Sequence, residues 1–206
     1  MRLFLFCITL VVFVNTSAQN ADIRLLREIN LHRNQSLDKS FKFITNSITP
    51  VLIGAPIILY TIGQLRSLPE TNEKTIALIG AIGCAGVSTF AIKYMVKRER
   101  PFNTYSDIER LTDGSSYSFP SGHTSSTFAL ATSLSLAYPK WYIIAPSFAY
   151  AGLVAYSRMD LGVHYPSDVL AGALLGVGSA YLSRYITYKL YPKIFKPNST
   201  NNVLQN

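Results

Sequence analysis

Three groups of polar side chains stand at the borders of uncharged stretches in this sequence. The first contains Lys93, Lys97, Arg98 and Arg100, and Pro101 follows it directly. Positions 93, 97 and 100 are separated by four and three residues, which predicts one face of a helix that the proline then ends. Interfacial lysine and arginine commonly extend to lipid headgroups, so this group alone predicts no chemistry.

The second and third groups contain two of the three histidines. In the second, Ser118–His123, Ser121 is the expected N-cap of a helix whose free first-turn amides would bind an anion. The third contains Arg158, His164 and Asp168. His164 and Asp168 are four residues apart, which on a helix puts them on one face. The carboxylate would then hold one ring nitrogen and leave the other free as a base or nucleophile.

Together the three groups suit the transfer of a phosphoryl group. The charge of a phosphoryl transition state spreads over three equatorial oxygens, and fixed cations and helix amides stabilise that charge. One histidine activated by a carboxylate can attack phosphorus, and a second can protonate the departing oxygen. The sequence has no cluster of carboxylates that would hold Mg²⁺ or Zn²⁺. We therefore expect phosphoryl transfer without a metal or other cofactor.

The elements that must position these groups are membrane-spanning helices. Only 15% of the residues are charged, and the charges leave five long uncharged stretches. Because a spanning helix needs about 20 apolar residues, each stretch predicts a span, and a soluble bundle with buried helices is the alternative. The predicted spans are 43–65, 75–92, 123–138, 141–157 and 168–188. Consecutive spans are antiparallel, so all three polar groups would lie on one side of the membrane. Gly172 and Gly176 are expected to let helices pack closely within this bundle.

The predicted fold class is all-α, a polytopic transmembrane helical bundle with five spans. Residues 1–18 are expected to be a signal peptide, because their apolar run of 12 residues is short for a span and small residues follow it. A retained first transmembrane helix is the alternative, and it would make six spans. Residues 19–42 form an amphipathic segment that lies at the membrane interface or packs as a lid. The transmembrane domain would cover 43–190, and 191–206 would be a polar tail.

Composition excludes several classes of protein. Thirteen tyrosines and eleven phenylalanines exclude intrinsic disorder, and two cysteines exclude a disulfide scaffold or a cysteine-built metal site. The net charge of +8 indicates an anionic partner, either nucleic acid, anionic lipid or phosphate. With five predicted spans, we expect the partners to be the membrane and a phosphorylated lipid, and no nucleic acid. The sequence does not predict an oligomeric state.

The motifs resemble those of a known family. Lys93-x6-Arg100-Pro101, Pro120-Ser121-Gly122-His123 and Ser157-Arg158-x5-His164-x3-Asp168 are similar to the three motifs of the type 2 phosphatidate phosphatase family, the lipid phosphate phosphatases. The resemblance implies that His164 is the nucleophile, forming a phosphohistidine, that Asp168 orients it, and that His123 is the general acid. It also implies a phosphate site, made by Lys93, Arg100, Ser121, Gly122 and Arg158.

The resemblance leaves two alternatives and the identity of the substrate open. The family also resembles vanadium haloperoxidases, but those are larger soluble proteins, and the predicted spans argue against them. A non-catalytic lipid-binding or lipid-moving membrane protein is the other alternative, although binding alone would not need both histidines. Phosphatidate, phosphatidylglycerol phosphate, polyprenyl pyrophosphate and lipid A phosphate are candidate substrates.

The predicted location is the bacterial inner membrane with the site facing the periplasm. A cleaved signal would place residue 19 outside the cytoplasm, and counting spans then puts the three polar groups outside as well. Eleven lysines and arginines lie on that side against seven on the other, which favours the opposite orientation. Five of the eleven belong to the groups that phosphate binding explains, so we give the signal more weight.

Overall fold

The computed structural model describes residues 20–195. The expected signal peptide at 1–18 lies outside the described residues, and so does the chain beyond residue 195. Within the described range the secondary structure is entirely helical, without a strand. After a helical segment at residues 20–31, the elements are η1 (Gln35–Leu37), α2 (Asp38–Asn46), α3 (Ile48–Leu65), α4 (Pro69–Val96), α5 (Pro101–Thr104), α6 (Gly122–Ala137), α7 (Trp141–Asp160) and α8 (Pro166–Phe195).

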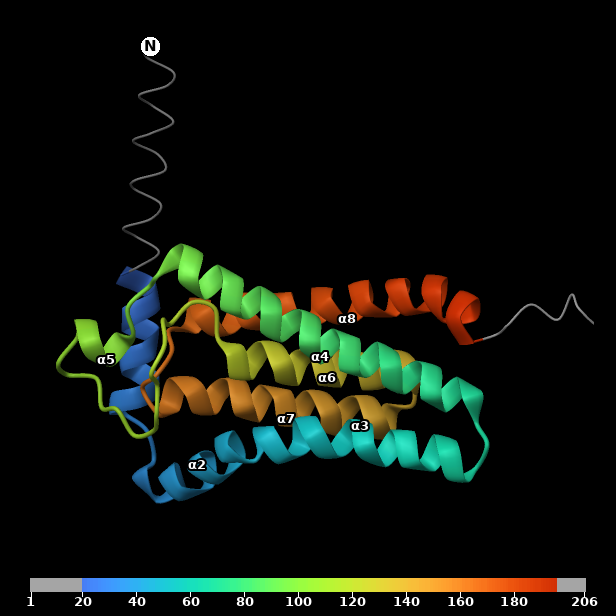
Figure 1. The fold of residues 1–206 in the computed structure, drawn as a ribbon. Helices are drawn as coiled ribbons and strands as arrows, with labels where there is room; N and C mark the ends of the chain where they lie inside the picture. Colours follow the sequence, from blue (N-terminus) through green and yellow to red (C-terminus); the bar gives the residue numbers. More distant parts are fainter. Residues whose placement is uncertain (1–19, 196–206) are drawn as a thin grey trace, which may run out of the picture.

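Five long helices, α3, α4, α6, α7 and α8, run alongside one another (Figure 1). Helix α6 is central, because it packs against α3, α4, α7 and α8. The helix at 20–31, α5 and the loop that follows α5 gather at one end of the bundle (Figure 1). That end also holds the carboxyl ends of α4 and α7 and the amino ends of α6 and α8, as the predicted alternation of spans requires.

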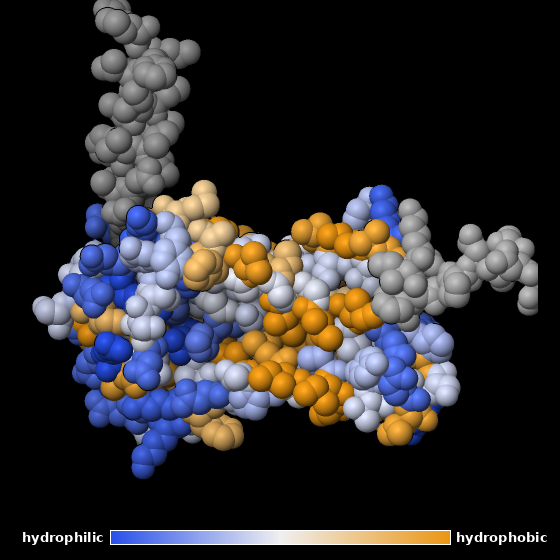
Figure 2. Space-filling view, viewed as in Figure 1, coloured by the Kyte–Doolittle hydropathy of each residue, from blue (hydrophilic) through white to orange (hydrophobic). Residues whose placement is uncertain are grey.

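Small side chains fill the middle of the bundle, and large apolar ones cover its outside. Ala81, Ala85, Ala129 and Ala180 form a buried cluster between α4, α6 and α8. On the outer surface, Ile57, Phe90 and Leu174 are 59%, 64% and 66% exposed. Figure 2 shows apolar residues across the middle of the visible face and polar residues gathered at the end that carries the helix at 20–31. Exposed apolar flanks around a small-residue interior are typical of helices packed in lipid rather than of a soluble bundle.

Gly172 and Gly176 bring α8 against α6, as the sequence predicts. A Cβ atom at Gly176 would lie 2.2 Å from the Ser125 carbonyl oxygen, and one at Gly172 would lie 2.6 Å from the Ser121 carbonyl oxygen. No side chain larger than hydrogen fits at either position without moving a backbone. This close contact holds the amino ends of α6 and α8 together, and both helices carry site residues.

Within residues 20–195, three segments are long and apolar enough to cross a membrane: Ile48–Leu65, Pro69–Thr104 and Pro166–Leu190. The chain is an integral membrane protein. The predicted spans at 123–138 and 141–157 coincide with α6 and α7, but α6 has only 16 residues and α7 does not reach the apolar average of those three segments. Serine and threonine lower the hydropathy of α6, and α7 contains tyrosine, tryptophan and proline. The first span begins later than predicted, because α2 takes residues up to Asn46.

Two local expectations for helices at this end are wrong. Helix α4 ends at Val96, and Lys97 takes a left-handed conformation with φ of 51°, so Lys93, Lys97 and Arg100 do not share a helix face. Arg100 is extended because it precedes Pro101, which disfavours the helical region for the residue before it. His164 lies in the turn before α8 rather than on the helix itself.

Candidate active site

His164 and Asp168 form a hydrogen-bonded pair at the start of α8. The side chains of both residues are buried, and His164 Nδ1 lies 3.3 Å from Asp168 Oδ2. The other ring nitrogen, Nε2, lies 3.3 Å from Arg100 Nη1. Since a guanidinium only donates, Nε2 accepts there and Nδ1 carries the proton that it donates to Asp168. The lone pair of the ring is therefore on Nε2, where an electrophile would have to replace the hydrogen bond from Arg100.

The carboxylate of Asp168 is held by several donors besides His164. Oδ2 accepts a hydrogen bond from the Ser118 hydroxyl and another, of 2.9 Å, from the Tyr165 backbone N–H. Oδ1 accepts from Arg98 Nη1 at 2.7 Å. Charge-assisted bonds of this kind stabilise a buried carboxylate in its ionised form and fix its position.

Burial lowers the pKa of His164 to about 3, because the charged imidazolium would lose its hydration there. The hydrogen bond and the charge of Asp168 act in the opposite direction, and the charges of Arg100 and Arg158 reinforce the decrease. The ring is therefore neutral at physiological pH. A neutral imidazole has the free electron pair that a nucleophile needs.

A cavity of about 310 Å³ lies beside His164, and six of the eight predicted site residues line it: Lys93, Arg100, Gly122, His123, Arg158 and His164. The other lining residues come from α2 and from the loop before α6: Asn46, Thr112, Asp113, Gly114, Ser115 and Ser116. A second cavity, of about 410 Å³, shares Arg100 and residues 114–116 with the first. The site therefore has room beyond the histidines.

The three cations of the cavity are bound by neutral groups. Lys93 Nζ donates to the carbonyls of Tyr117 and Ser118. Arg100 donates from Nε to the Ser116 carbonyl at 2.7 Å and from Nη1 to the Val163 carbonyl at 2.8 Å. Among the described residues, no carboxylate forms an ion pair with any of these cations. Their uncompensated positive charge favours an anionic ligand.

Of the three cations, Arg158 has a buried N–H group without a hydrogen-bond partner. Its Nη1 donates to the Thr45 hydroxyl at 2.6 Å and its Nη2 to the Asp113 carbonyl at 3.3 Å. Its Nε is buried and has no hydrogen-bond partner. A buried donor without an acceptor is costly, and an anion in the cavity that Arg158 lines would supply the missing acceptor.

Ser121 and Gly122 form the beginning of α6 beside the cavity. Ser121 is the N-cap, as predicted, and its Oγ accepts from the Thr124 backbone N–H and, at 2.9 Å, from the Thr124 hydroxyl. Gly122 lines the cavity, whereas Ser121 is fully buried behind it. The Ser121 backbone N–H donates to the Asp168 carbonyl at 3.0 Å, which ties α6 to α8.

The sequence does not predict the part that several other residues take in the site. Thr45 holds Arg158 from 113 positions away, and Asn46 lines the cavity from the same helix. Gly114 allows a close approach, because a Cβ there would lie 2.9 Å from the Arg100 guanidinium. Ser118 and Arg98 stand within the polar groups that the sequence singles out, but their bonds to Asp168 depend on the tertiary fold.

The helix at 20–31 packs on this end of the bundle. Ile23 and Leu26 join a buried cluster with Ile108 and Tyr165. Asn30 is buried, and its Nδ2 donates to the carbonyls of Glu109, at 3.1 Å, and Asp160, at 2.8 Å. The helix thereby joins the loop before α6 to the end of α7.

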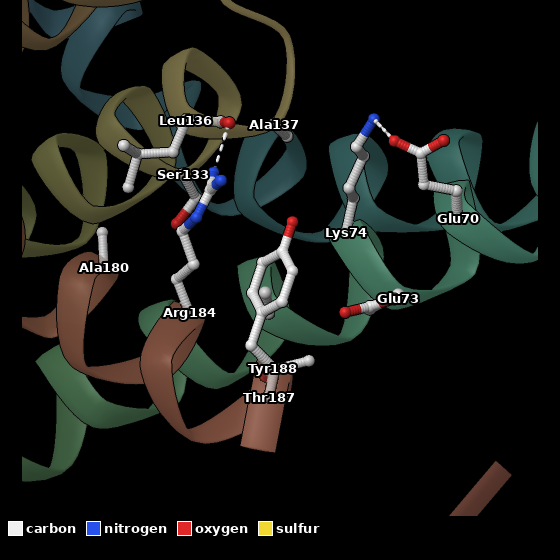
Figure 3. A pocket seen from close by; sticks show the side chains of 11 residues that line it. Glu70, Glu73, Lys74, Ser133, Leu136, Ala137, Ala180, Arg184, Thr187 and Tyr188 are labelled. Carbon is white, nitrogen blue, oxygen red and sulfur yellow. Dashed lines mark hydrogen bonds and ion pairs between the residues drawn. The ribbon is translucent and has the colours of Figure 1, made fainter. Parts of the chain in front are cut away.

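The opposite end of the bundle has a cavity of only about 30 Å³, between α4, α6 and α8. Figure 3 shows Lys74 paired with Glu70 there, and Arg184 donating to the Leu136 carbonyl. Because a cavity needs about 10–15 Å³ to hold one water molecule, this cavity accommodates waters rather than a lipid headgroup. Over residues 20–195, no three His, Cys, Asp or Glu side chains are grouped as metal ligands.

Comparison with known proteins gives matches over most of the chain. Residues 74–192 match the PAP2 superfamily. The chain is 34% identical over 198 residues to an undecaprenyl-diphosphatase of Sulfolobus acidocaldarius, covering 89% of this chain and 91% of the relative.

Two solved structures are also similar. The crystal structure of Aquifex aeolicus LpxE has a TM-score of 0.71 and 34% identity, covering 79% of this chain and 94% of LpxE. The PAP2 type phosphatidylglycerolphosphate phosphatase of Bacillus subtilis has a TM-score of 0.71 and 25% identity, covering 91% of this chain and 94% of that one.

Proposed function

Because the chain belongs to the PAP2 superfamily, we propose that it hydrolyses a phosphate monoester or diphosphate of a membrane lipid in the cavity beside His164. One observation supports this proposal more strongly than the rest of the structure does. Three buried cations without carboxylate partners line the same cavity as two histidines, one of which is neutral and oriented by Asp168. This arrangement fits a phosphate that is attacked, not one that is only bound.

In the first step, the Nε2 lone pair of His164 forms an N–P bond as the bond from phosphorus to the lipid oxygen breaks. His123 gives its proton to the departing oxygen, so the lipid leaves as an alcohol or as a shorter phosphate. Lys93, Arg100 and Arg158 neutralise the three equatorial oxygens, with the Gly122 N–H as a further donor. Ser121 accepts two bonds from Thr124 and keeps its own O–H to donate.

In the second step, neutral His123 takes a proton from water as the water oxygen attacks phosphorus. The N–P bond then breaks, inorganic phosphate leaves and the lone pair returns to His164. The proton stays on His164 Nδ1 throughout, hydrogen-bonded to the Asp168 carboxylate, which stabilises the positive charge that develops on the ring. All the groups needed are side chains of this chain, so the proposed reaction requires no metal.

We further propose five spans, α3, α4, α6, α7 and α8, in a bacterial inner membrane with the site on the periplasmic side. The antiparallel order of the five helices supports the count. For the substrate, the undecaprenyl-diphosphatase relative supports a polyprenyl diphosphate, and the adjoining cavity of about 410 Å³ offers room for a second phosphate.

The test is to trap the intermediate. Purified protein in detergent, given a lipid phosphate labelled with ³²P, should show an acid-labile, base-stable phosphoprotein that His164→Asn lacks. Phosphate release should survive EDTA and be blocked by vanadate, which mimics five-coordinate phosphorus. Activity that is lost in EDTA and restored by Mg²⁺ would contradict the mechanism. A panel of phosphatidate, phosphatidylglycerol phosphate, polyprenyl diphosphate and lipid A phosphate would identify the substrate.

A further inference from the structure

Arg98 bridges two carboxylates that lie 146 positions apart in the chain. Its Nη1 donates to Asp168 Oδ1, and its Nη2 donates to Asp22 Oδ2, both at 2.7 Å. Its guanidinium also stacks over the Tyr165 ring, with Cζ 3.8 Å from the ring centroid. One cation therefore joins the helix at 20–31 to the carboxylate that holds His164.

Asp22 also binds the first turn of α8. Its Oδ1 accepts from the Ser167 backbone N–H at 2.9 Å, and its Oδ2 accepts from the Ser167 hydroxyl. Ser167 is the residue before Asp168, and its N–H is one of the first-turn amides that a helix leaves unpaired. Asp22 thus caps α8 from a different helix. The Asp22 side chain is only 8% exposed, and that of Asp168 is fully buried.

The two oxygens of Asp168 have separate partners. Oδ2 accepts hydrogen bonds from His164, Ser118 and the Tyr165 backbone N–H, whereas Oδ1 accepts one from Arg98. A guanidinium that is free to turn can bind a carboxylate through both oxygens at once. The second nitrogen of Arg98, Nη2, instead donates to Asp22. This bond restricts Arg98 to the Oδ1 atom of Asp168, so Oδ2 remains available to accept from His164.

We propose that Asp22 is a positioning residue of the phosphatase reaction, acting through Arg98 and the first turn of α8 on the orientation of the Asp168–His164 pair. The proposal rests on the catalytic roles assigned to His164 and Asp168 above. It gives the segment at the amino end of the described chain a part in catalysis, in addition to its packing on the bundle.

A purely structural role for Asp22 makes a different prediction, and the chain offers a matched control. Arg27, on the same helix, pairs with Asp107 of the loop before α6 through Nε at 2.7 Å. This ion pair docks the same helix onto the same end of the bundle, but the described structure gives it no contact with Arg98 or Asp168. Asp107→Asn therefore loosens the docking without touching the chain of bonds to His164.

The experiment compares Asp22→Asn, Asp22→Glu and Asp107→Asn in purified, monodisperse protein. Because a small misplacement of a reacting group can cost on the order of 100-fold in rate, Asp22→Asn should lower kcat about 10- to 100-fold, with KM within about twofold of wild type. Asp22→Glu keeps the charge and should recover most of the loss. Asp107→Asn should keep kcat within about twofold. Equal losses in Asp22→Asn and Asp107→Asn would overturn the proposal.

A double-mutant cycle tests whether Asp22 acts through Arg98. Because Asp22 also binds Ser167, adding Asp22→Asn to Arg98→Gln should lower kcat by a smaller factor than Asp22→Asn does in the wild type. Losses that multiply would overturn the proposal, as would an Asp22→Glu protein that folds but is no more active than Asp22→Asn. His164→Asn separates this inference from the proposed function. If His164→Asn is inactive while Asp22→Asn turns over like wild type, only the inference fails; if His164→Asn still turns over, the proposed function fails.

Discussion

The two histidines of the cavity have different surroundings, and this suits them to different steps. His164 is buried and hydrogen-bonded through Nδ1 to Asp168. His123 lines the cavity from the first turn of α6, and its ring makes no hydrogen bond within the described part of the chain. A ring that a carboxylate orients by a hydrogen bond suits a nucleophile, because its lone pair must point in one direction. A ring without such a bond can turn to donate a proton to the departing oxygen.

The proposed roles of the two histidines predict how the activity lost in each variant depends on the leaving group of the substrate. General acid catalysis is worth about 10²–10⁴-fold, but nitrophenolate leaves readily without a proton. His123→Ala should therefore lose far more activity on a lipid phosphate monoester than on nitrophenyl phosphate, while His164→Ala should abolish both. The measurement is kcat/KM for both substrates with each variant. Equal loss ratios for the two variants would mean that the roles are assigned wrongly.

The protonation state of His164 gives a second prediction at this scale. With a pKa of about 3, its ring signals in the NMR spectrum of ¹³C,¹⁵N-histidine-labelled protein should not titrate between pH 8 and 5. His164→Gln identifies the signals by removing them. A midpoint near 6.5, the ordinary value, would contradict the burial argument. Because the unfolded ring binds a proton below about pH 6.5 and the folded ring does not, this group destabilises the fold increasingly as pH falls from 6.5 towards 3.

At the scale of elements, the contact between α6 and α8 decides whether the site can assemble. Helix α6 brings Gly122 and His123, and α8 brings Asp168. Their axes approach closely because Gly172 and Gly176 leave room for the backbone of α6. The bond from the Ser121 N–H to the Asp168 carbonyl joins the two amino ends. An alteration that separates these helices would separate His123, the proposed acid, from Asp168 and the proposed nucleophile that it holds.

Gly176 and Gly178 provide a matched pair for testing this contact. A Cβ at Gly176 would lie 2.2 Å from the Ser125 carbonyl, whereas a Cβ at Gly178 would meet nothing within 4 Å. Gly176→Ala should destabilise the protein by about 1–3 kcal/mol through overpacking and reduce activity, and Gly178→Ala should leave both intact. Thermal unfolding in detergent and phosphate release measure the two effects. Equal melting temperatures for the two variants would show that the close contact is not what holds α6 to α8.

At the scale of the whole molecule, the polar end of the bundle determines which leaflet supplies the substrate. The helix at 20–31 and the loop before α6 lie at this end (Figure 1), and polar residues gather there (Figure 2). Residues 112–116 of that loop line the cavity. At the opposite end, described residues of α4, α6 and α8 enclose the small cavity of Figure 3. A lipid phosphate must therefore reach the site from the leaflet at the polar end.

The proposed orientation can be tested at Ser115, which is exposed at the cavity. In a variant in which Cys7 and Cys84 are replaced by serine, Ser115→Cys should react with a membrane-impermeant thiol reagent on intact cells, because the site is proposed to face the periplasm. A cysteine at Arg66, in the turn between α3 and α4 at the other end, should react only after lysis. The reverse pattern would place the active site in the cytoplasm.

The sequence alone determined the family and the all-helical fold class, and only the tertiary structure decided how the polar groups are held. Lys93, Arg100, His123, Arg158, His164 and Asp168 were identified from residue type and spacing, because antiparallel helices must bring alternate ends to one side of a membrane. Their partners could not be identified in this way. Thr45 on Arg158, Asp22 on Arg98 and the lone pair of His164 facing Arg100 depend on contacts across 64 to 113 positions. Hydrophobic periodicity is a local property, whereas a hydrogen bond between distant side chains exists only once the backbones have packed.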